Sequence, residues 1–289
     1  IRDSPKIDAV IVSTPPFAHM QPTLDALAAG KHVLCEKPFS LDPAEAERMV
    51  AAAEASGKFL AVASARHRLG QAALKAHELV AAGELGHVYH VRYSRFRVRG
   101  RPGIDMFQDA VWFLDKQRAG GGAIMDIGVY QIDLALWLLG NPLVSSVVAS
   151  MYQGIGVPPP EGVKQDVEDH AVITMACKNG ASAIVETAWA SNVAGADALL
   201  VFGTDAGLRF DPLTKITAGP DRKAIEQPVF EHEEPRTMGG GISRVTASFV
   251  EDVLAGRQPM TPPRDALEVT RVMAAAYRSV ETGQAVSLG

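Results

Sequence analysis

The turn Cys35-Glu36-Lys37-Pro38 holds the first side chain of this sequence that is suited to chemistry, the amine of Lys37. A lysine that a turn keeps partly away from water can have a lowered pKa, and it can polarise a carbonyl group or pass a proton. Pro38 restricts the backbone, so we expect Lys37 to project from a rigid support. An isolated Glu-Lys-Pro tripeptide is a weak motif, and an ordinary surface pair is the alternative interpretation.

A second set of reactive side chains follows the glycine run Gly120–Gly122. Asp126, Tyr130 and Asp133 are spaced at i, i+4 and i+7, which places all three on one face of a helix. Two carboxylates and a phenol on one stripe, behind glycines that allow a close backbone approach, predict an acid–base site. A solvated polar face, with Asp126 as the helix N-cap, is the alternative.

Hydroxyl groups gather at a third place, Ser13-Thr14-Pro15, where an apolar run ends. These hydroxyls and the backbone of the turn suit the ribose or the pyrophosphate of a dinucleotide. A plain tight turn is the alternative, because the two successive prolines also favour one. His19 follows shortly after, either as part of this site or as an ordinary residue at the start of a helix.

The elements that must position these residues alternate between strand and helix in the first part of the chain. Apolar runs predict buried strands, and Ala/Glu-rich segments that end in glycine predict helices. The predicted strands are 9–13, 32–35 and 59–64, and the predicted helices are one that ends at 29 and another over 43–56. This order indicates a doubly wound parallel sheet. Ligands bind at the carboxyl ends of such strands, where Lys37 falls.

From Gln71 onward the pattern changes to long strands with few helices. The predicted strands are 87–98, 144–152, 170–177, 181–189 and 198–203, and the predicted helices are 71–82, 126–139, 242–254 and 264–280. Asn179-Gly180 between alternating apolar runs is a strong hairpin signal, so we expect a mainly antiparallel sheet. We therefore predict two domains, 1–69 and 70–289, with loops over 154–163 and 219–241.

Charge and composition exclude several classes of protein. A net charge of −5 predicts no nucleic-acid partner and no binding to an anionic membrane. Apolar runs are too short to span a bilayer. The segment Arg92–Arg101 holds five arginines that alternate with apolar residues, which predicts a strand with a wet face; anion binding by this run is the alternative.

Cysteine and histidine placement argues for a reduced, metal-free protein. Cys35 and Cys177 lie far apart in apolar segments, which speaks against a disulfide framework and favours a cytoplasmic location. The eight histidines show no metal-ligand spacing, so we expect no bound metal. Sequence signatures of serine hydrolases, zinc proteases and P-loop nucleotide hydrolases are also absent from the sequence.

Taken together, these segments resemble the glucose-fructose oxidoreductase / inositol dehydrogenase family, called Gfo/Idh/MocA. The resemblance runs through the chain, from 7–15 and 26–38 through Glu84-Leu85-Gly86 and 120–133 to 275–283. The Glu-Lys-Pro turn combined with the later Asp126-x-Gly-x-Tyr130-x-x-Asp133 pattern is its most specific part. The resemblance implies a Rossmann-type domain followed by a domain with a large open sheet, covered by helices on one face.

The resemblance also implies a function and a set of roles. It implies an NAD(P)-dependent dehydrogenase or reductase that moves a hydride between nicotinamide and a CH–OH group of a sugar, polyol, cyclitol or dihydrodiol. Lys37, Tyr130 and Asp126 match the catalytic residues, and Asp133 and Trp112 match substrate-binding positions. The expected cofactor-binding residues, for NAD or NADP, are Ser13, Thr14, Pro15, His19, Glu36, Lys37 and Arg66.

Many family members carry histidine where this chain has Tyr130. A phenol, with an ordinary pKa of about 10, needs a nearby cation to work near neutrality. We therefore expect a relay in which Lys37 supports Tyr130 at the substrate oxygen. The alternative function is a non-catalytic, nucleotide-sensing or regulatory member of the same fold. A homodimer or homotetramer formed through the open sheet face is expected beside catalysis.

The family's pattern begins with a strand and a Gly-x-Gly-x-x-Gly turn that do not precede Ile1 here. At about 30 residues per unit, we expect that roughly 60 residues of a longer protein are not in this sequence. The family's specificity elements are variable loops, for which the candidates are Arg101–Phe107, Trp112 and Glu234–Ser243. Phe113 stands where relatives often place arginine, which weakens the inference of a highly polar or acidic substrate.

Overall fold

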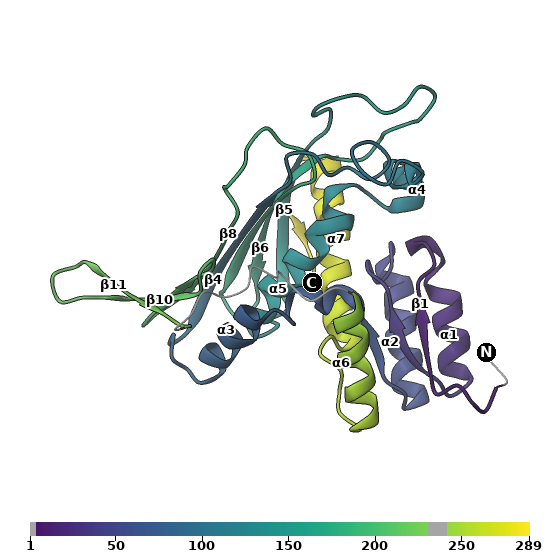
Figure 1. Cartoon of the computed structure of the whole chain (residues 1–289), viewed down its shortest axis with the longest axis horizontal. Coiled ribbons are helices and arrows are strands. Elements are labelled where there is room, and N and C mark those ends of the chain that lie inside the picture. The colour runs from purple at the N-terminus through teal and green to yellow at the C-terminus, as the bar shows by residue number, and fades with distance from the viewer. Residues whose placement is uncertain (1–3, 231–241) are drawn as a thin grey trace.

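The computed structural model describes residues 4–230 and 242–289, which form two sheets with helices between and beside them (Figure 1). The smaller sheet has three parallel strands in the order β1-β2-β3. Its elements are β1 (Ala9–Val12), α1 (Met20–Ala28), β2 (His32–Cys35), α2 (Pro43–Ser56) and β3 (Leu60–Val62). The predicted strand–helix alternation and parallel pairing of this part are confirmed.

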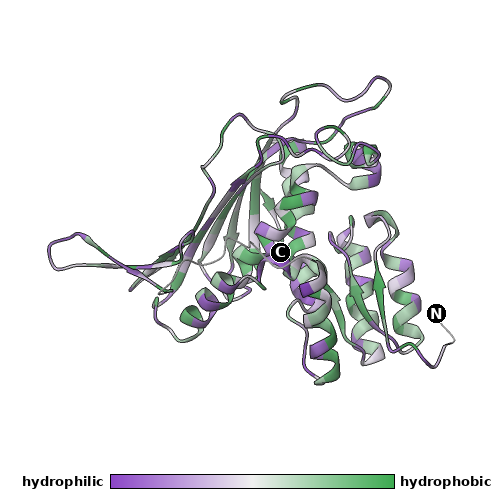
Figure 2. Cartoon of the chain, viewed as in Figure 1, coloured by the Kyte–Doolittle hydropathy of each residue, from purple (hydrophilic) through white to green (hydrophobic). Residues whose placement is uncertain are grey.

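Local sequence explains why these elements start and stop where they do. Asp42 caps α2 by accepting a hydrogen bond from the backbone N–H of Ala44, at 2.9 Å, and Pro43 occupies the first helical position. Gly57 ends the helix in the left-handed conformation, with φ of 65°. The strand β1 is hydrophobic along its length (Figure 2), but only Val12 is buried and Ile11 is 48% exposed, so the prediction of a buried strand is wrong for most of β1.

The larger sheet has nine strands in the order β11-β10-β9-β8-β4-β7-β6-β5-β12. Only the β4–β7 pair is parallel among its described pairs, so the prediction of a mainly antiparallel sheet is confirmed. The predicted strands correspond to β4 (Val88–Phe96), β5 (Val144–Tyr152), β6 (His170–Cys177), β7 (Ser182–Ala188) and β8 (Ala198–Gly203). The hairpin at Asn179-Gly180 joins β6 to β7.

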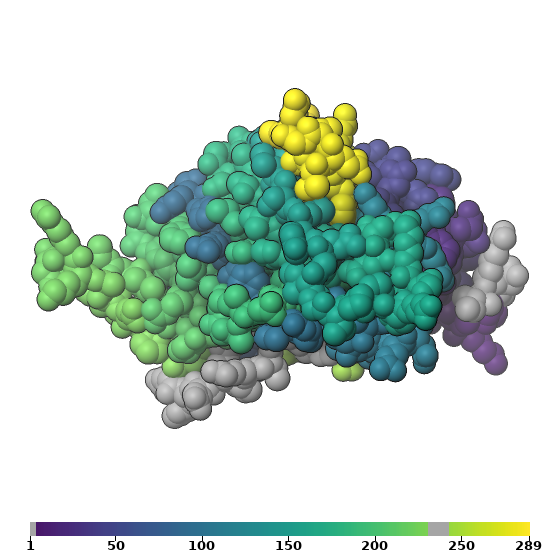
Figure 3. All heavy atoms as spheres, turned by 90° about the horizontal axis from the view of Figure 1, so that it is seen from above, coloured from purple at the N-terminus to yellow at the C-terminus, as the bar shows by residue number. Residues whose placement is uncertain are grey.

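Four strands of the larger sheet were not predicted from the sequence. They are β9 (Gly207–Arg209), β10 (Thr214–Ala218), β11 (Ala224–Pro228) and β12 (Val286–Ser287). All five residues of β11 are exposed, and its sequence, Ala-Ile-Glu-Gln-Pro, shows no alternation of apolar and polar residues that would predict a strand. The predicted loop over 219–241 is therefore wrong at this strand. Figure 3 shows the β10–β11 hairpin projecting from one end of the molecule.

Helices cover one face of the larger sheet, the side that faces the smaller sheet (Figure 1). They are α3 (Gln71–Ala81), α5 (Val129–Leu138) and α7 (Pro263–Thr282), and a short α4 (Lys116–Ala119) lies beyond them. The helix α7 packs against both β5 and α2, so it ties the two sheets together. The helix α6 (Ile242–Leu254) packs against the smaller sheet through Val245 and Phe249.

The helix α5 differs from the sequence prediction. The spacing of Asp126, Tyr130 and Asp133 predicted one polar face on a helix over 126–139. Instead, all ten residues of α5 are buried, and the preceding segment Ile124–Gly128 forms a wider π-helical turn. Neighbours surround this helix on every side, so its polar side chains lie inside the protein rather than on a wet stripe.

Candidate active site

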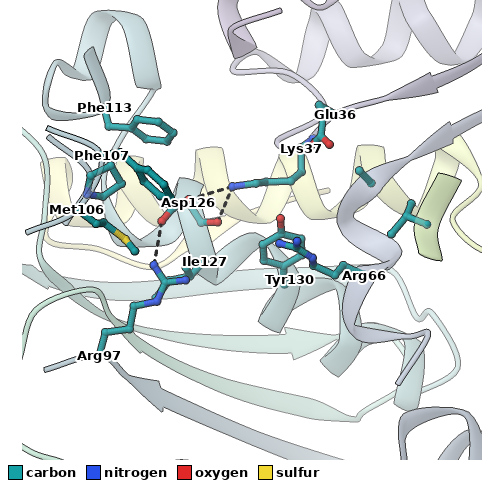
Figure 4. A pocket seen from close by; sticks show the side chains of 13 residues that line it. Glu36, Lys37, Arg66, Arg97, Met106, Phe107, Phe113, Asp126, Ile127 and Tyr130 are labelled. Atoms are coloured by element: carbon teal, nitrogen blue, oxygen red, sulfur yellow. Dashed lines mark hydrogen bonds and ion pairs between the residues drawn. The ribbon is translucent and has the colours of Figure 1, made fainter. Parts of the chain in front are cut away.

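Two cavities meet beside Lys37, between the carboxyl ends of the small sheet and the start of α5. The first has a volume of about 370 Å³ and is drawn in Figure 4. It is lined by Glu36, Lys37, Ala63, Arg66, Arg97, Pro102, Met106, Phe107, Phe113, Asp126, Ile127, Tyr130 and Val245. The second, of about 260 Å³, is lined by Ser13, Thr14, Pro15, Pro16, Glu36, Lys37, Pro38, Trp112, Phe113, Ala119, Gly121, Met125 and Asp126.

An ion pair between Lys37 and Asp126 stands where the two cavities join. The Lys37 amine donates to the Asp126 carboxylate at 3.0 Å and to its backbone carbonyl at 2.8 Å. The two side chains are only 15% and 13% exposed, so the pair is screened little by water. A second cation, Arg97, lies 3.5 Å from the other carboxylate oxygen (Figure 4).

The charge state of Lys37 follows from this pairing. Burial by itself would lower the pKa of Lys37, but attraction to the Asp126 carboxylate, with smaller contributions from Tyr130 and Glu36, outweighs burial and raises it. The lowered pKa that the sequence argument allowed is therefore the wrong direction. Lys37 is held as an ammonium, which suits it to donate a hydrogen bond or a proton and not to act as a base.

Tyr130 lies directly below this ammonium. Its ring centroid is 5.2 Å from the Lys37 nitrogen and 5.8 Å from the Arg66 guanidinium carbon. Figure 4 shows the phenol oxygen pointing toward the side chain of Lys37. The ring also stacks on His67, with centroids 4.9 Å apart and planes inclined by 27°. These contacts hold the phenol at the cavity surface.

His67 is the buried member of this stack. It lies 3.4 Å from the Tyr93 hydroxyl and 3.3 Å from an Arg95 nitrogen. Burial, together with repulsion from the cations Arg95 and Arg66, lowers the pKa of His67 to about 3. The imidazole is therefore neutral at physiological pH and adds no charge beneath Tyr130.

A neutral buried histidine makes stability depend on pH. Its folded pKa of about 3 lies below the unfolded value of 6.5, so its contribution to stability is complete above pH 6.5 and is lost as the pH falls from 6.5 toward 3. At 1.36 kcal/mol per pKa unit, the loss by pH 5 is about 2 kcal/mol. We expect the His67→Gln variant to lose less stability than the unmodified protein between pH 7 and pH 5 in urea unfolding. Equal losses in both proteins would contradict this assignment.

A buried carboxylate fixes the glycine segment that leads to Asp126. Glu168 accepts hydrogen bonds from the backbone N–H groups of Gly122 and Ile124, both at 2.9 Å, and from the Tyr277 hydroxyl at 2.9 Å. A Cβ at Gly122 would lie 2.0 Å from the Glu168 carbonyl oxygen, so only glycine fits there. This contact sets where the π-helical turn begins and where it presents Asp126.

Asp133 does not line either cavity. It is fully buried and forms a two-point ion pair with Arg68, with N–O distances of 2.6 and 2.9 Å. Ser64 donates a further hydrogen bond to it at 3.1 Å. The structure thus places Asp133 in the support of the helix, away from the Asp126–Tyr130 cavity where the sequence prediction had put it.

The expected cofactor residues divide between the two cavities. Ser13, Thr14 and Pro15 line the second cavity, and Arg66 lines the first. Glu36 lines both, and its carboxylate accepts a hydrogen bond from the Lys37 backbone N–H at 3.1 Å. Trp112, expected to bind substrate, lines the second cavity beside Phe113.

His19 is absent from both linings and is almost fully buried. Its ring nitrogens lie 2.9 Å from the Pro38 carbonyl oxygen and 2.8 Å from the Thr14 carbonyl oxygen. Burial lowers the pKa of His19, which favours a neutral ring; such a ring donates one hydrogen bond, to the carbonyl oxygen of one turn, while its other nitrogen packs against the second turn. It therefore sets the spacing between the hydroxyl-bearing turn and the lysine-bearing turn.

Several functional positions were missed by sequence reasoning. Arg97 belongs to the basic run but follows the end of β4, where strand alternation no longer tells which way it points. His67 and Glu168 carry no local motif. Of the predicted specificity segments, Met106 and Phe107 line the first cavity, and 234–241 lies outside the described residues.

The second cavity suits one end of a nicotinamide dinucleotide. It opens at the carboxyl ends of parallel strands and combines the hydroxyls of Ser13 and Thr14 with the rings of Trp112 and Phe113, whose centroids are 3.9 Å apart. Residues 4–230 and 242–289 contain no group of three or more His, Cys, Asp or Glu that could hold a metal ion. In the same ranges, no helix has the length and apolar character needed to cross a bilayer.

Comparison with known proteins places this site in a family. Residues 1–64 match the family described as "Oxidoreductase family, NAD-binding Rossmann fold", and residues 73–209 match the "GFO/IDH/MocA C-terminal domain". The chain is 30% identical to D-glucoside 3-dehydrogenase of Escherichia coli (strain K12), over 98% of this chain and 80% of that protein. It is 28% identical to 1,5-anhydro-D-fructose reductase of Ensifer adhaerens, over the same shares of the two chains.

A solved structure agrees with the sequence comparison. The crystal structure of GenD2 from gentamicin A biosynthesis, in complex with NAD, superimposes with a TM-score of 0.73. It is 26% identical, and the match covers all of this chain and 80% of that one. Both matched families and the shared fold agree with the resemblance drawn from the sequence, so this chain belongs to the Gfo/Idh/MocA family of NAD-binding oxidoreductases.

Proposed function

We propose that this chain oxidises a secondary alcohol of a sugar or polyol, or reduces the corresponding carbonyl, with NAD(H) or NADP(H). The observation that carries the proposal is the Lys37–Asp126 ion pair, which stands between the first cavity, lined by Tyr130, and the second cavity, lined by the hydroxyls of Ser13 and Thr14. The relatives named as a glucoside dehydrogenase and an anhydrofructose reductase support the substrate class.

Ser13, Thr14 and Trp112 would hold the nicotinamide end of the cofactor in the second cavity. Bound there, the nicotinamide ring supplies hydride transfer to or from the substrate carbon. Asp126 holds the Lys37 ammonium in place through the carboxylate contact at 3.0 Å. Because both residues line both cavities, they lie within reach of cofactor and substrate together.

The proton moves through the chain's own side chains. In the reductive direction, Tyr130 gives its hydroxyl proton to the substrate oxygen, and the Lys37 ammonium stabilises the phenolate that remains. Lys37 then returns a proton to the phenolate and takes one from solvent in its place. In the oxidative direction, the Tyr130 phenolate, stabilised by the Lys37 ammonium, takes the alcohol proton. The raised pKa of Lys37 supports this division, because it keeps the lysine charged at the moment when Tyr130 exchanges its proton with the substrate.

The Tyr130→Phe variant tests this relay. It keeps the ring that stacks on His67 and removes only the hydroxyl, so the fold should be unaffected. We expect kcat to fall by about 100-fold, the lower end of what general acid–base catalysis contributes. Turnover is measured at the reduced-nicotinamide absorbance band, and cofactor binding by fluorescence titration. Unchanged turnover with intact cofactor binding would rule out the phenol as the proton carrier.

The proposed activity itself is tested with a panel of sugars and polyols, each with NAD and with NADP. An absorbance change at the reduced-nicotinamide band with at least one substrate supports it. Cofactor binding without turnover on any of them would favour the alternative, a nucleotide-sensing member of the fold.

We further propose that the open face of the larger sheet pairs with a second copy of this chain in the cytoplasm. Val148 and Tyr152 on β5 are 49% and 61% exposed, and Val172 and Ile184 lie partly exposed on the neighbouring strands. Apolar side chains on an uncovered sheet face favour association. The Ile184→Lys variant should reduce the mass measured by light scattering to that of one chain.

Both cysteines are free and buried, which supports a reducing compartment.

A further inference from the structure

The first cavity has an excess of positive charge. Its charged lining residues are the cations Lys37, Arg66 and Arg97 and the carboxylates Glu36 and Asp126, which gives a net charge of +1. The chain as a whole carries −5, so the cavity has the opposite sign to the protein. Cavities with low-dielectric walls focus such a field and attract ligands of opposite charge.

The excess of positive charge comes from the two arginines, because the charge of Lys37 is neutralised by its ion pair with Asp126. The side chain of Arg66 forms no ion pair or hydrogen bond within residues 4–230 and 242–289, and its guanidinium lies 5.8 Å from the centroid of the Tyr130 ring. Arg97 has only long contacts, at 3.5 Å, to Asp126 and to the Gly100 carbonyl oxygen.

The surroundings of Arg97 leave its charge incompletely compensated. Its side chain is 33% exposed, and burial lowers its pKa more than the attraction of Asp126 raises it; the neighbouring cations Arg95 and Arg66 lower it further. A partly buried guanidinium with long, poor contacts is costly unless a ligand completes its hydrogen bonds.

We propose that Arg66 and Arg97 form a subsite for an anionic group of the substrate, a carboxylate or a phosphate, so that the enzyme acts on sugar acids or sugar phosphates. Both guanidiniums border the same cavity as Tyr130 and Asp126 (Figure 4). A planar guanidinium binds either anion through two parallel hydrogen bonds. The inference rests on the proposed function, because it assigns the substrate of that same site.

The cofactor does not remove this excess of charge. The residues suited to its ribose and phosphates, Ser13 and Thr14, line the second cavity, whereas Arg66 and Arg97 line the first. The oxidised nicotinamide ring is itself a cation, so its arrival beside Lys37 would add to the positive charge. Among residues 4–230 and 242–289, no carboxylate other than Asp126 pairs with either arginine, so a substrate anion would neutralise them during turnover.

The apolar part of the cavity lining would orient such a substrate. Met106, Phe107 and Phe113 lie on the side of the cavity away from Arg66, and Arg97 lies on the same side as they do (Figure 4). The C–H face of a sugar ring can pack on these side chains while its anionic group faces the arginines. This arrangement presents one edge of the ring to Tyr130 and Lys37. Phe113, whose type weakens the inference of a highly polar or acidic substrate, belongs to this apolar lining, whereas the positive charge comes from Arg66 and Arg97.

The first test compares kcat/KM for D-glucose, D-glucuronate and D-glucose 6-phosphate. We expect one of the two anions to be preferred over the neutral sugar by about 10- to 100-fold, the usual effect of charge-assisted hydrogen bonds. The advantage should shrink as ionic strength rises. Preference for glucuronate identifies a carboxylate and preference for the phosphate ester identifies a phosphate. A neutral sugar used as well as, or better than, both anions would overturn the inference while leaving the proposed function intact.

Two variants test whether Arg66 and Arg97 cause the preference for an anionic substrate. Arg66→Gln and Arg97→Gln should each lower the ratio of kcat/KM between the preferred anion and D-glucose by about 10-fold or more. Arg48→Gln, which removes the same charge from an exposed position on α2, should leave that ratio unchanged. An unchanged ratio in both cavity variants would contradict the assignment.

A binding measurement separates this inference from the catalytic proposal. D-glucuronate or D-glucose 6-phosphate should raise the thermal unfolding temperature of the unmodified protein, and D-glucose at equal concentration and ionic strength should raise it less. The shift should disappear in Arg66→Gln. An anion-selective shift without turnover of any sugar supports the subsite and contradicts the proposed function. Without an anion-selective shift in binding or in turnover, the subsite is excluded.

Discussion

Replacing Lys37 by methionine is expected to lower kcat/KM by about 10²- to 10⁴-fold, the range that a positioned proton donor contributes. Methionine keeps the length of the side chain and removes the ammonium that faces Asp126 at 3.0 Å and the Tyr130 ring at 5.2 Å. The substrate oxygen then loses its cationic partner, and the phenolate of Tyr130 loses its stabilisation. Initial rates at the reduced-nicotinamide band measure the effect.

Controls separate a catalytic loss from a structural one. Lys178→Met removes a lysine from the exposed β6–β7 turn and should leave the rate unchanged. Lys37→Arg keeps a positive charge but releases a proton far less readily, so it should recover only part of the activity. If Lys37→Met retained more than about a third of the activity, a role in proton transfer would be excluded.

Replacing Arg68 by methionine is expected to lower the free energy of unfolding by about 3–5 kcal/mol, as removal of one partner of a buried ion pair does. Arg68 is 1% exposed and Asp133 is fully buried, so the change leaves a carboxylate without its partner inside the protein. Asp265, whose oxygen lies 3.0 Å from Arg68, loses the same cation. Urea unfolding with an unchanged m-value measures the loss.

Two comparisons show that burial causes this effect. In the pair Arg257–Asp252 the arginine side chain is 65% exposed, so water reaches the pair and Arg257→Met should cost less than about 1 kcal/mol. The double variant Arg68→Met/Asp133→Leu should be more stable than Arg68→Met alone, because no charge is then left unpaired at Asp133. A loss in Arg68→Met no larger than in Arg257→Met would refute the assignment.

The same pair also decides between two roles for Asp133. If Asp133 bound substrate, Asp133→Asn would raise KM and leave stability unchanged. Its two-point contact with Arg68 predicts the reverse, a loss of stability at nearly constant KM. The spacing that joined Asp133 to Asp126 and Tyr130 describes an isolated helix, and it contains no information on what packs around that helix.

Local features of the sequence were enough to predict most of the helices and strands. The apolar runs at β1 and β2, the Asp42-Pro43 start of α2 and the Asn179-Gly180 hairpin depend on neighbouring residues, and all were predicted correctly. Lys37 could be singled out because it follows a buried parallel strand, where ligand sites form. The strands β9 to β12 were not predicted from the sequence. β9 and β12 are very short, all residues of β11 are exposed, and β12 forms by pairing with β5, which is far away in the sequence.

The turn at Lys37 shows what the sequence by itself determined and what only the tertiary structure decided. The sequence placed a lysine at the end of a parallel strand and an aspartate behind a glycine run. Only the fold brings them to 3.0 Å and so makes the lysine a lasting cation, because electrostatic pairing depends on distance in space. The fold likewise turns Arg66 toward a cavity and Arg68 toward the core. No local pattern in the sequence distinguishes these two arginines, because they have the same charge and lie in the same turn.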